Sequence, residues 1–240
     1  MDFDLIRLDL HNNLKVLLPL NLPLSERKGK HRDAYQEFLQ GSPNLVRRHL
    51  TAVSTILPRH LNQVKKVLHM FGGVGAMAQI IAQLSPDAEQ IIWERDETLC
   101  RFMKEFYPDV KVVHVDDSLK RIHEFELGDT DMVCMDASML TIRTAGLKDI
   151  WLRVAEAHVP YVWLTDSSCS KIHLNYRAYT ADFGRHIEPN AESYLEAYSE
   201  GLEINTGYRI VDAMREAGAT YCLAMLDHEG KTFPRPIPYL

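Results

Sequence analysis

The stretch from Val67 to Asp96 constrains the fold most, because its pattern changes from strand to glycine turn to helix to strand. An apolar run over residues 67–70 stops at Gly72-Gly73. Apolar residues at helical spacing follow from Ala76 to Leu84, and a second apolar run ends at Glu94. Apolar positions at i, i+3, i+4 and i+7 are typical of a helix buried on one face. The stretch therefore predicts a β-α-β unit of a parallel sheet.

The turn and the acid of this unit also predict a ligand site. Glycines allow a sharp turn and a close approach of a ligand to the backbone. The helix that starts after Gly75 presents free N–H groups to an anion. A carboxylate at the position of Glu94 can accept hydrogen bonds from a ribose diol. The alternative is an ordinary β-α-β unit whose glycines only ease helix–strand packing.

The rest of the chain continues the alternation of helices and strands. We expect helices at 97–107, 119–125, 147–158 and 192–217, the last with a break near 205–207, and strands at 110–115, 131–135, 160–164 and 220–226. The last strand should form an antiparallel edge hairpin with residues 231–238. The prediction is an α/β fold: a Rossmann-like three-layer sandwich whose sheet is mostly parallel, with an antiparallel C-terminal hairpin.

The N-terminal part has a different pattern. Residues 2–18 predict a β-hairpin, residues 19–33 a loop, and residues 33–40 and 43–57 two helices, the second ended by Pro58. We therefore divide the chain into an N-terminal hairpin and helical substrate or cap region, residues 1–60, and a Rossmann-like domain, residues 61–240.

Charge is distributed unevenly. The net charge is −6, which argues against general affinity for nucleic acids. Residues 25–66 nevertheless hold nine Lys or Arg against three acids, 9 − 3 = +6. This basic segment is compatible with a nucleic-acid partner and equally with a solvated helical face. A small-molecule substrate is the other possibility.

Cysteine use and hydropathy suggest the compartment. The four cysteines are Cys100, Cys134, Cys169 and Cys222, and they form no CxxC pair. We expect buried free thiols, a reducing compartment and a cytoplasmic protein. No apolar run approaches the ~20 residues of a membrane span, and Asp2 and Asp4 argue against a secretory signal. The acids are not spaced as a ligand set, so no metal site is predicted.

Residues 64–226 resemble the class I S-adenosylmethionine-dependent methyltransferases. Gly72, Gly73 and Gly75 match the family's first motif, Glu94 its ribose-binding acid, and Asp116 or Asp117 its acid near the adenine. The resemblance adds Phe71 and Asp136 to these candidate cofactor-binding residues. The resemblance implies S-adenosylmethionine as cofactor. His69 stands where the family often has an acid, and Phe71 where it often has the first glycine.

The methyl acceptor is not indicated by any known motif. FGGVG resembles the FxGxG turn of cytosine-5 DNA methyltransferases, but their Pro-Cys nucleophile is missing, and so is the [DN]PP[YFW] motif of exocyclic-amine methyltransferases. The resemblance makes Asp136 the first candidate for a general base next to the methyl group, and Asp166 the second. Either aspartate is also a good helix N-cap.

Three further interpretations stay open. Asp136, Lys171 and Glu203 lie in the order of the set used by ribose 2′-O-methyltransferases. Aminopropyltransferases that make polyamines share the glycine turn, the acid after the second strand and an aspartate after the fourth. A non-catalytic binding or assembly subunit on the same fold is the third, and His69 favours it.

Overall fold

The structure, a computed structural model, describes residues 44–61, 64–73, 75–138, 145–166, 188, 190–216 and 219–226. The predicted N-terminal hairpin, the loop 19–33, the first helix and the strand 231–238 lie outside these residues. In chain order the described helices and strands are α3 (Asn44–His60), β1 (Lys66–His69), α4 (Ala76–Leu84), β2 (Glu89–Glu94), α5 (Glu97–Phe106), β3 (Lys111–His114), α6 (Ser118–Arg121), the 3-10 helix η2 (Ile122–Glu124), β4 (Met132–Ser138), α7 (Ala145–Glu156), β5 (Tyr161–Asp166), α9 (Ala191–Thr206), β6 (Tyr208–Glu216) and β7 (Ala219–Leu226).

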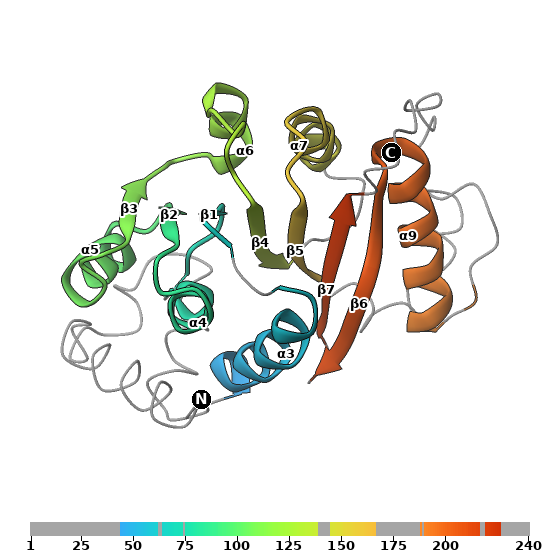
Figure 1. The fold of residues 1–240 in the computed structure, drawn as a ribbon, viewed down its shortest axis with the longest axis horizontal. Helices are drawn as coiled ribbons and strands as arrows, with labels where there is room; N and C mark the ends of the chain where they lie inside the picture. Colours follow the sequence, from blue (N-terminus) through green and yellow to red (C-terminus); the bar gives the residue numbers. More distant parts are fainter. Residues whose placement is uncertain are drawn as a thin grey trace, which may run out of the picture.

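The strands form one seven-stranded sheet of order β3-β2-β1-β4-β5-β7-β6 (Figure 1). Strands β1 to β5 pair in parallel, whereas β7 runs antiparallel to both β5 and β6. The order reverses at β1, whose neighbours are β2 and β4. Ligands of open α/β sheets bind at such a switch point, outside the carboxyl ends of the strands. The predicted fold class is confirmed.

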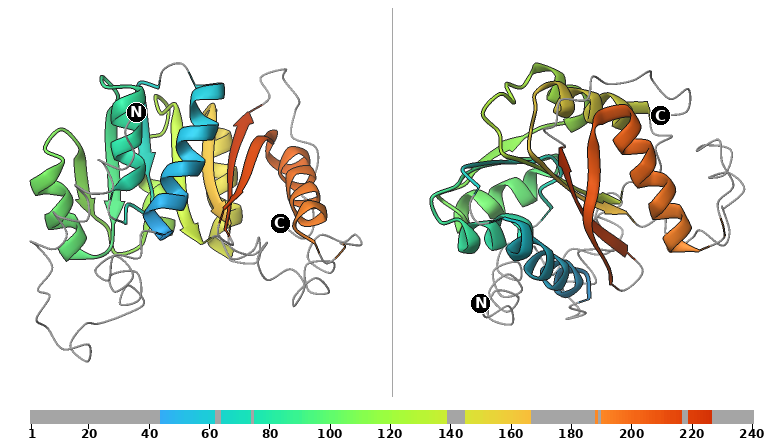
Figure 2. Two further views of the ribbon diagram at one scale, coloured as in Figure 1. Left: turned by 90° about the horizontal axis from the view of Figure 1, so that it is seen from below. Right: turned by 45° about the vertical axis from the view of Figure 1, so that its right-hand side comes forward.

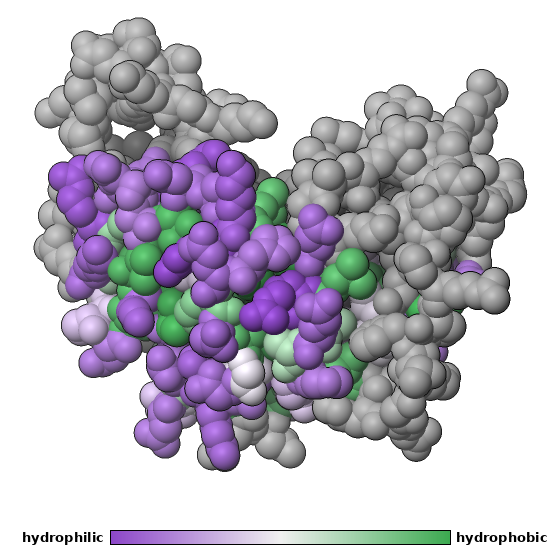
Figure 3. Space-filling view, turned by 90° about the horizontal axis from the view of Figure 1, so that it is seen from above, coloured by the Kyte–Doolittle hydropathy of each residue, from purple (hydrophilic) through white to green (hydrophobic). Residues whose placement is uncertain are grey.

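Helices cover both faces of the sheet, which gives three layers (Figures 1 and 2). Helices α3, α4 and α5 lie on one face, and α6, α7 and α9 on the other. Neighbouring strand residues alternate between two cores: Ile92 packs with α4 and α5, and Trp93 packs on the opposite side. Strands buried on both faces are expected to be almost continuously apolar. From the side of α6 and α7 the described surface is mostly hydrophilic, with smaller hydrophobic areas (Figure 3).

The C-terminal hairpin is built from different residues than predicted. The expected helix 192–217 ends at Thr206, because Gly207 takes a left-handed conformation, φ 75°, and its N–H bonds to the carbonyl of Glu203 at 3.1 Å. Residues 208–216 are strand β6, which pairs with β7 and occupies the edge of the sheet. The predicted break near 205–207 is therefore confirmed, whereas the helix predicted beyond it, up to residue 217, was wrong. In the structure β7 forms a hairpin with β6, the strand before it in the chain, whereas the prediction paired it with residues after it.

Helix α3 was predicted to end at Pro58 but continues to His60. Proline removes one hydrogen bond and crowds the preceding turn, yet the last turn persists, with the Leu61 N–H bonded to the carbonyl of Leu57 at 2.8 Å. The side chains of Val53 and Ile56 are fully buried in the core on the α4 face. This helix of the predicted 1–60 region thus packs directly on the sheet domain. The division at residue 60 itself stays a prediction.

Candidate cofactor site

The glycine turn between β1 and α4 is held by backbone hydrogen bonds. The Gly72 N–H donates to the carbonyl of Trp93 at 2.9 Å, and the Gly75 N–H donates to the carbonyl of Gly72 at 2.9 Å. Gly73 and Gly75 have φ of 54° and 76°, in the left-handed region that favours glycine. The turn is therefore fixed against the end of β2, where the predicted acid lies.

Steric surroundings separate the three glycines. A Cβ at Gly72 would lie 2.2 Å from Ile92 Cγ2, and a Cβ at Gly75 would lie 2.5 Å from Tyr107 Cε2. A Cβ at Gly73 would meet no atom of the described residues within 4 Å. Two glycines thus serve close packing of the turn on β2 and on the residue after α5. The third faces open space, where a ligand can approach its backbone.

Glu94 ends β2, and its carboxylate binds backbone N–H groups on both sides. Oε2 accepts from Gly73 at 2.7 Å, and Oε1 accepts from Arg95 and Asp96, both at 2.8 Å. The residue is only 6% exposed. A buried carboxylate requires such partners, because its desolvation is otherwise costly. The predicted acid and the predicted glycine turn are therefore in direct contact.

The start of α4 completes this corner of the sheet. Gly75 is the N-cap residue and offers no side chain to the N–H groups of the first turn. Unsatisfied N–H groups at a helix start carry partial positive charge and favour an anionic ligand group. Behind the corner, burial raises the pKa of the Tyr107 hydroxyl, and burial, followed by the charge of Glu94, raises the pKa of Cys100 to about 11. Both groups stay neutral near pH 7.

Asp116 and Asp117 follow β3 and differ from each other. Asp117 is the N-cap of α6, since Oδ1 accepts from the Leu119 N–H at 3.0 Å and the Lys120 N–H at 3.3 Å. The side chain of Asp116 is 94% exposed, with Oδ1 3.7 Å from His114 Nε2. Between the two predicted adenine-site acids, the one with carboxylate oxygens open to a ligand is therefore Asp116.

The two catalytic candidates are placed by their backbone alone. Asp136 lies in β4 where its register with β5 shifts, between Met135 and Ser138. Bulges of this kind are frequent beside active sites. Asp166 is the last residue of β5 and is the register partner of Thr220 in β7. Both residues stand at carboxyl ends of the strands, as predicted, and their catalytic roles stay predictions.

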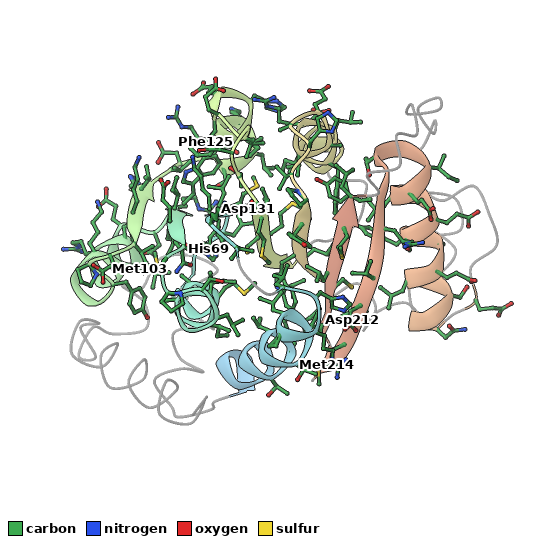
Figure 4. All side chains as sticks on the ribbon, viewed as in Figure 1. His69, Met103, Phe125, Asp131, Asp212 and Met214 are labelled. Atoms are coloured by element: carbon green, nitrogen blue, oxygen red, sulfur yellow. The ribbon has the colours of Figure 1, made fainter. Side chains whose placement is uncertain are left out.

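His69 replaces the acid of the family motif and is a core residue. It is 3% exposed, and its Nε2 lies 2.9 Å from Oε1 of Gln90, which is also buried (Figure 4). Gln90 Nε2 donates to the carbonyl of Ala78 in α4 at 3.0 Å. The carbonyl of Ala78 can only accept, so the amide nitrogen of Gln90 must face it. Oε1 of Gln90 therefore faces the imidazole and accepts, which places a proton on Nε2 of His69. These two hydrogen bonds connect β1, β2 and α4 behind the turn.

Phe71 is the other departure from the family motif. Its side chain is partly buried and packs against the core on the face of the sheet that α6, α7 and α9 cover. The position is thus used for packing on the sheet.

The basic segment is described in part. Arg59 and His60 at the end of α3 contact Asp212 Oδ2 of β6 at 3.4 and 2.9 Å (Figure 4). Lys66 pairs with Asp129 at 2.7 Å. Lys66 begins β1 and therefore lies at the amino edge of the sheet, opposite the glycine turn. This lysine therefore does not flank the glycine turn, and a nucleic-acid partner stays a prediction.

Three other predictions involve cysteines, metals and membranes. Cys100, Cys134 and Cys222 are buried free thiols, as predicted, and Cys169 lies outside the described residues. Among the residues that the structure describes, no three His, Cys, Asp or Glu gather as metal ligands. In the same part of the chain no helix is long and apolar enough to cross a bilayer.

No protein-family model and no curated protein sequence matches the chain. Several solved structures are nevertheless similar to it in fold. PigF with SAH superposes with a TM-score of 0.52 at 13% identity, covering 93% of this chain and 71% of that one. The N,N-8-amino-8-demethyl-D-riboflavin dimethyltransferase RosA from Streptomyces davawensis gives 0.50 at 12% identity, covering 92% and 69%. A protein of Pyrococcus horikoshii OT3 gives 0.53 at 11% identity, covering 75% and 91%.

These similarities, together with the strand order and the reversed β7, define the fold class. The chain has the class I S-adenosylmethionine-dependent methyltransferase fold. Its structural neighbours include a dimethyltransferase, and another neighbour was solved with SAH bound.

Proposed function

We propose that the protein binds S-adenosylmethionine at the corner formed by the glycine turn, Glu94 and the start of α4, and transfers its methyl group. The observation that carries the proposal is the open space beside Gly73, directly next to a carboxylate with remaining acceptor capacity. Packing requires Gly72 and Gly75, but within the part of the chain that the structure describes no atom occupies the space at Gly73. A cofactor whose ribose approaches this turn would use that space.

Different residues of the site would bind different parts of the cofactor. Glu94 would hold the ribose, the first turn of α4 would face the anionic end of the cofactor, and Asp116 would face the adenine. The bound cofactor supplies an activated methyl group on a sulfonium, so the protein has mainly to align the acceptor. Asp136 would take a proton from a hydroxyl or ammonium acceptor, with Asp166 as the second candidate. The acceptor class, nucleic acid or small molecule, is decided by experiment.

Calorimetric titration of S-adenosylmethionine into the purified chain tests the proposal. We expect binding by the wild type and roughly tenfold to hundredfold weaker binding by Glu94→Gln, because hydrogen bonds to a charged group are lost. Gly73→Ala should weaken binding similarly, since its methyl group occupies the open space. Asp129→Asn is the control, because Asp129 precedes β4 at the opposite edge of the sheet and is exposed.

Folding of each variant is checked by circular dichroism. Binding that is absent from the wild type, or equal in all four proteins, would refute the proposed site. Decarboxylated S-adenosylmethionine is titrated in parallel: preferential binding of this ligand, followed by transfer to putrescine, would replace methyl transfer by aminopropyl transfer. Binding without transfer to any nucleic-acid or small-molecule acceptor would favour the non-catalytic subunit.

A further inference from the structure

The hydrogen bonds of Glu94 limit what its carboxylate can still accept. Oε1 already accepts two backbone N–H bonds, from Arg95 and Asp96, both at 2.8 Å. Oε2 accepts one, from Gly73 at 2.7 Å. A carboxylate offers about four lone-pair positions, two on each oxygen. Three positions are therefore filled by the protein itself, and a single one, on Oε2, is left.

We propose that Glu94 accepts one ribose hydroxyl of the cofactor, through Oε2, and that the second hydroxyl is left to water. The inference rests on the proposed function. It differs from binding in which one carboxylate accepts both hydroxyls of the diol, since such binding would need a free position on Oε1.

The surroundings of Glu94 keep the three protein bonds in place. Its backbone carbonyl accepts from the Val115 N–H at 3.0 Å and from the Cys100 thiol at 3.4 Å. Asp96 is fixed as well, because its Oδ1 accepts from the Leu99 N–H of α5 at 3.1 Å. The Gly73 N–H belongs to a turn that Gly72 anchors on β2. A rotation of the carboxylate toward a diol would leave backbone donors without partners, which is costly in a buried site.

Deoxy analogues of S-adenosylhomocysteine count the hydroxyls that Glu94 holds. The parent compound and its 2′-deoxy and 3′-deoxy forms are titrated calorimetrically into the full chain. We expect one analogue to bind within about threefold of the parent and the other to bind roughly tenfold to hundredfold more weakly, because one hydrogen bond to a charged group is lost. In Glu94→Gln the difference between the two analogues should shrink to about threefold or less, because the charged acceptor is gone.

Each outcome decides. Equal, large losses for both analogues would show that the protein holds both hydroxyls, and loss for neither would show that it holds none. Either result overturns the inference while leaving cofactor binding intact. Selectivity that persists in Glu94→Gln would assign the preference to another group and overturn it too. Should this variant not fold, the wild-type titrations alone still count the hydroxyls. Failure of the parent compound to bind would refute the proposed function, and the inference with it.

Discussion

Alanine at Gly73 and alanine at Gly75 should destabilise the fold by clearly different amounts. Gly73→Ala places a side chain in a left-handed conformation, which costs about 1–2 kcal/mol for an L-residue, and adds no contact. Gly75→Ala carries the same backbone cost and also forces Cβ to 2.5 Å from the Tyr107 ring. Overpacking of a core typically costs about 1–3 kcal/mol, which gives a total of about 2–5 kcal/mol. The free energy of unfolding should therefore fall most for Gly75→Ala.

Urea unfolding followed by far-UV circular dichroism measures these differences from the midpoints, with a common slope. Gly128→Ala is the matched control, because Gly128 has no positive φ and no neighbour within 4 Å of a Cβ. This variant should change stability by less than about 1 kcal/mol, toward greater stability through the unfolded state. Equal losses for Gly73→Ala and Gly75→Ala would refute the distinction between an open and a packed glycine, on which the proposed site depends.

Two further predictions address the amino edge of the sheet and the thiol behind Glu94. Asp131→Ala should lower the free energy of unfolding by about 1–3 kcal/mol, because Asp131 Oδ2 accepts from the backbone of Lys65 and Lys66 at 2.5 and 3.0 Å (Figure 4). Asp129→Ala, which removes an exposed pair with Lys66, should cost less in the same urea assay, and an equal loss would contradict this reading. The pKa of Cys100, raised by burial from 9.0 to about 11, means that the native thiol stays protonated where the unfolded one ionises. Its contribution to stability is therefore complete below pH 9 and lost as the pH rises to about 11, and an alkylating reagent at pH 8 should label Cys100 only after unfolding, as mass spectrometry of its peptide would show.

The sequence predicted most of the fold because the sheet is buried on both faces. Strands β4 and β5 hold continuous apolar runs, residues 132–135 and 161–164, between helices of the correct period, and such runs identify a parallel sheet. Residues 208–216 were misassigned to a helix because Tyr208, Ile210 and Val211 fit either period, while the left-handed conformation of Gly207 is a property of the folded chain. The break near 205–207 was predicted, but the helical interpretation of the residues after it hid a strand whose partner, β7, begins only three residues beyond the end of β6.

Within the site, the sequence predicted positions better than contacts. The contact between Glu94 and the Gly73 N–H follows from the β-α-β unit, so a pattern could suggest it. The hydrogen bonds from His69 through Gln90 to Ala78 were missed, because no pattern in the sequence predicts which two side chains meet across neighbouring strands. A polar Gln90 in the otherwise apolar run of β2 was the one signal for them. Similarly, the choice between Asp116 and Asp117 depended on which aspartate caps α6, and adjacent aspartates give no hint of that.

The contacts of Glu94 also show which residue best separates an enzyme from a binding subunit on this fold. Three backbone N–H groups bind its buried carboxylate, so the fold would retain Glu94 even without a cofactor. His69 stands where the family often has an acid. Its hydrogen bond to Gln90 gives it a structural role in the core, so it argues neither for nor against catalysis. Gly73 is different. Its φ favours glycine, but no atom of the described residues packs where a Cβ would lie, so the space there is open to a ligand. The binding loss of Gly73→Ala, compared with its loss of stability, therefore reports on ligand function more directly than any substitution of the acid.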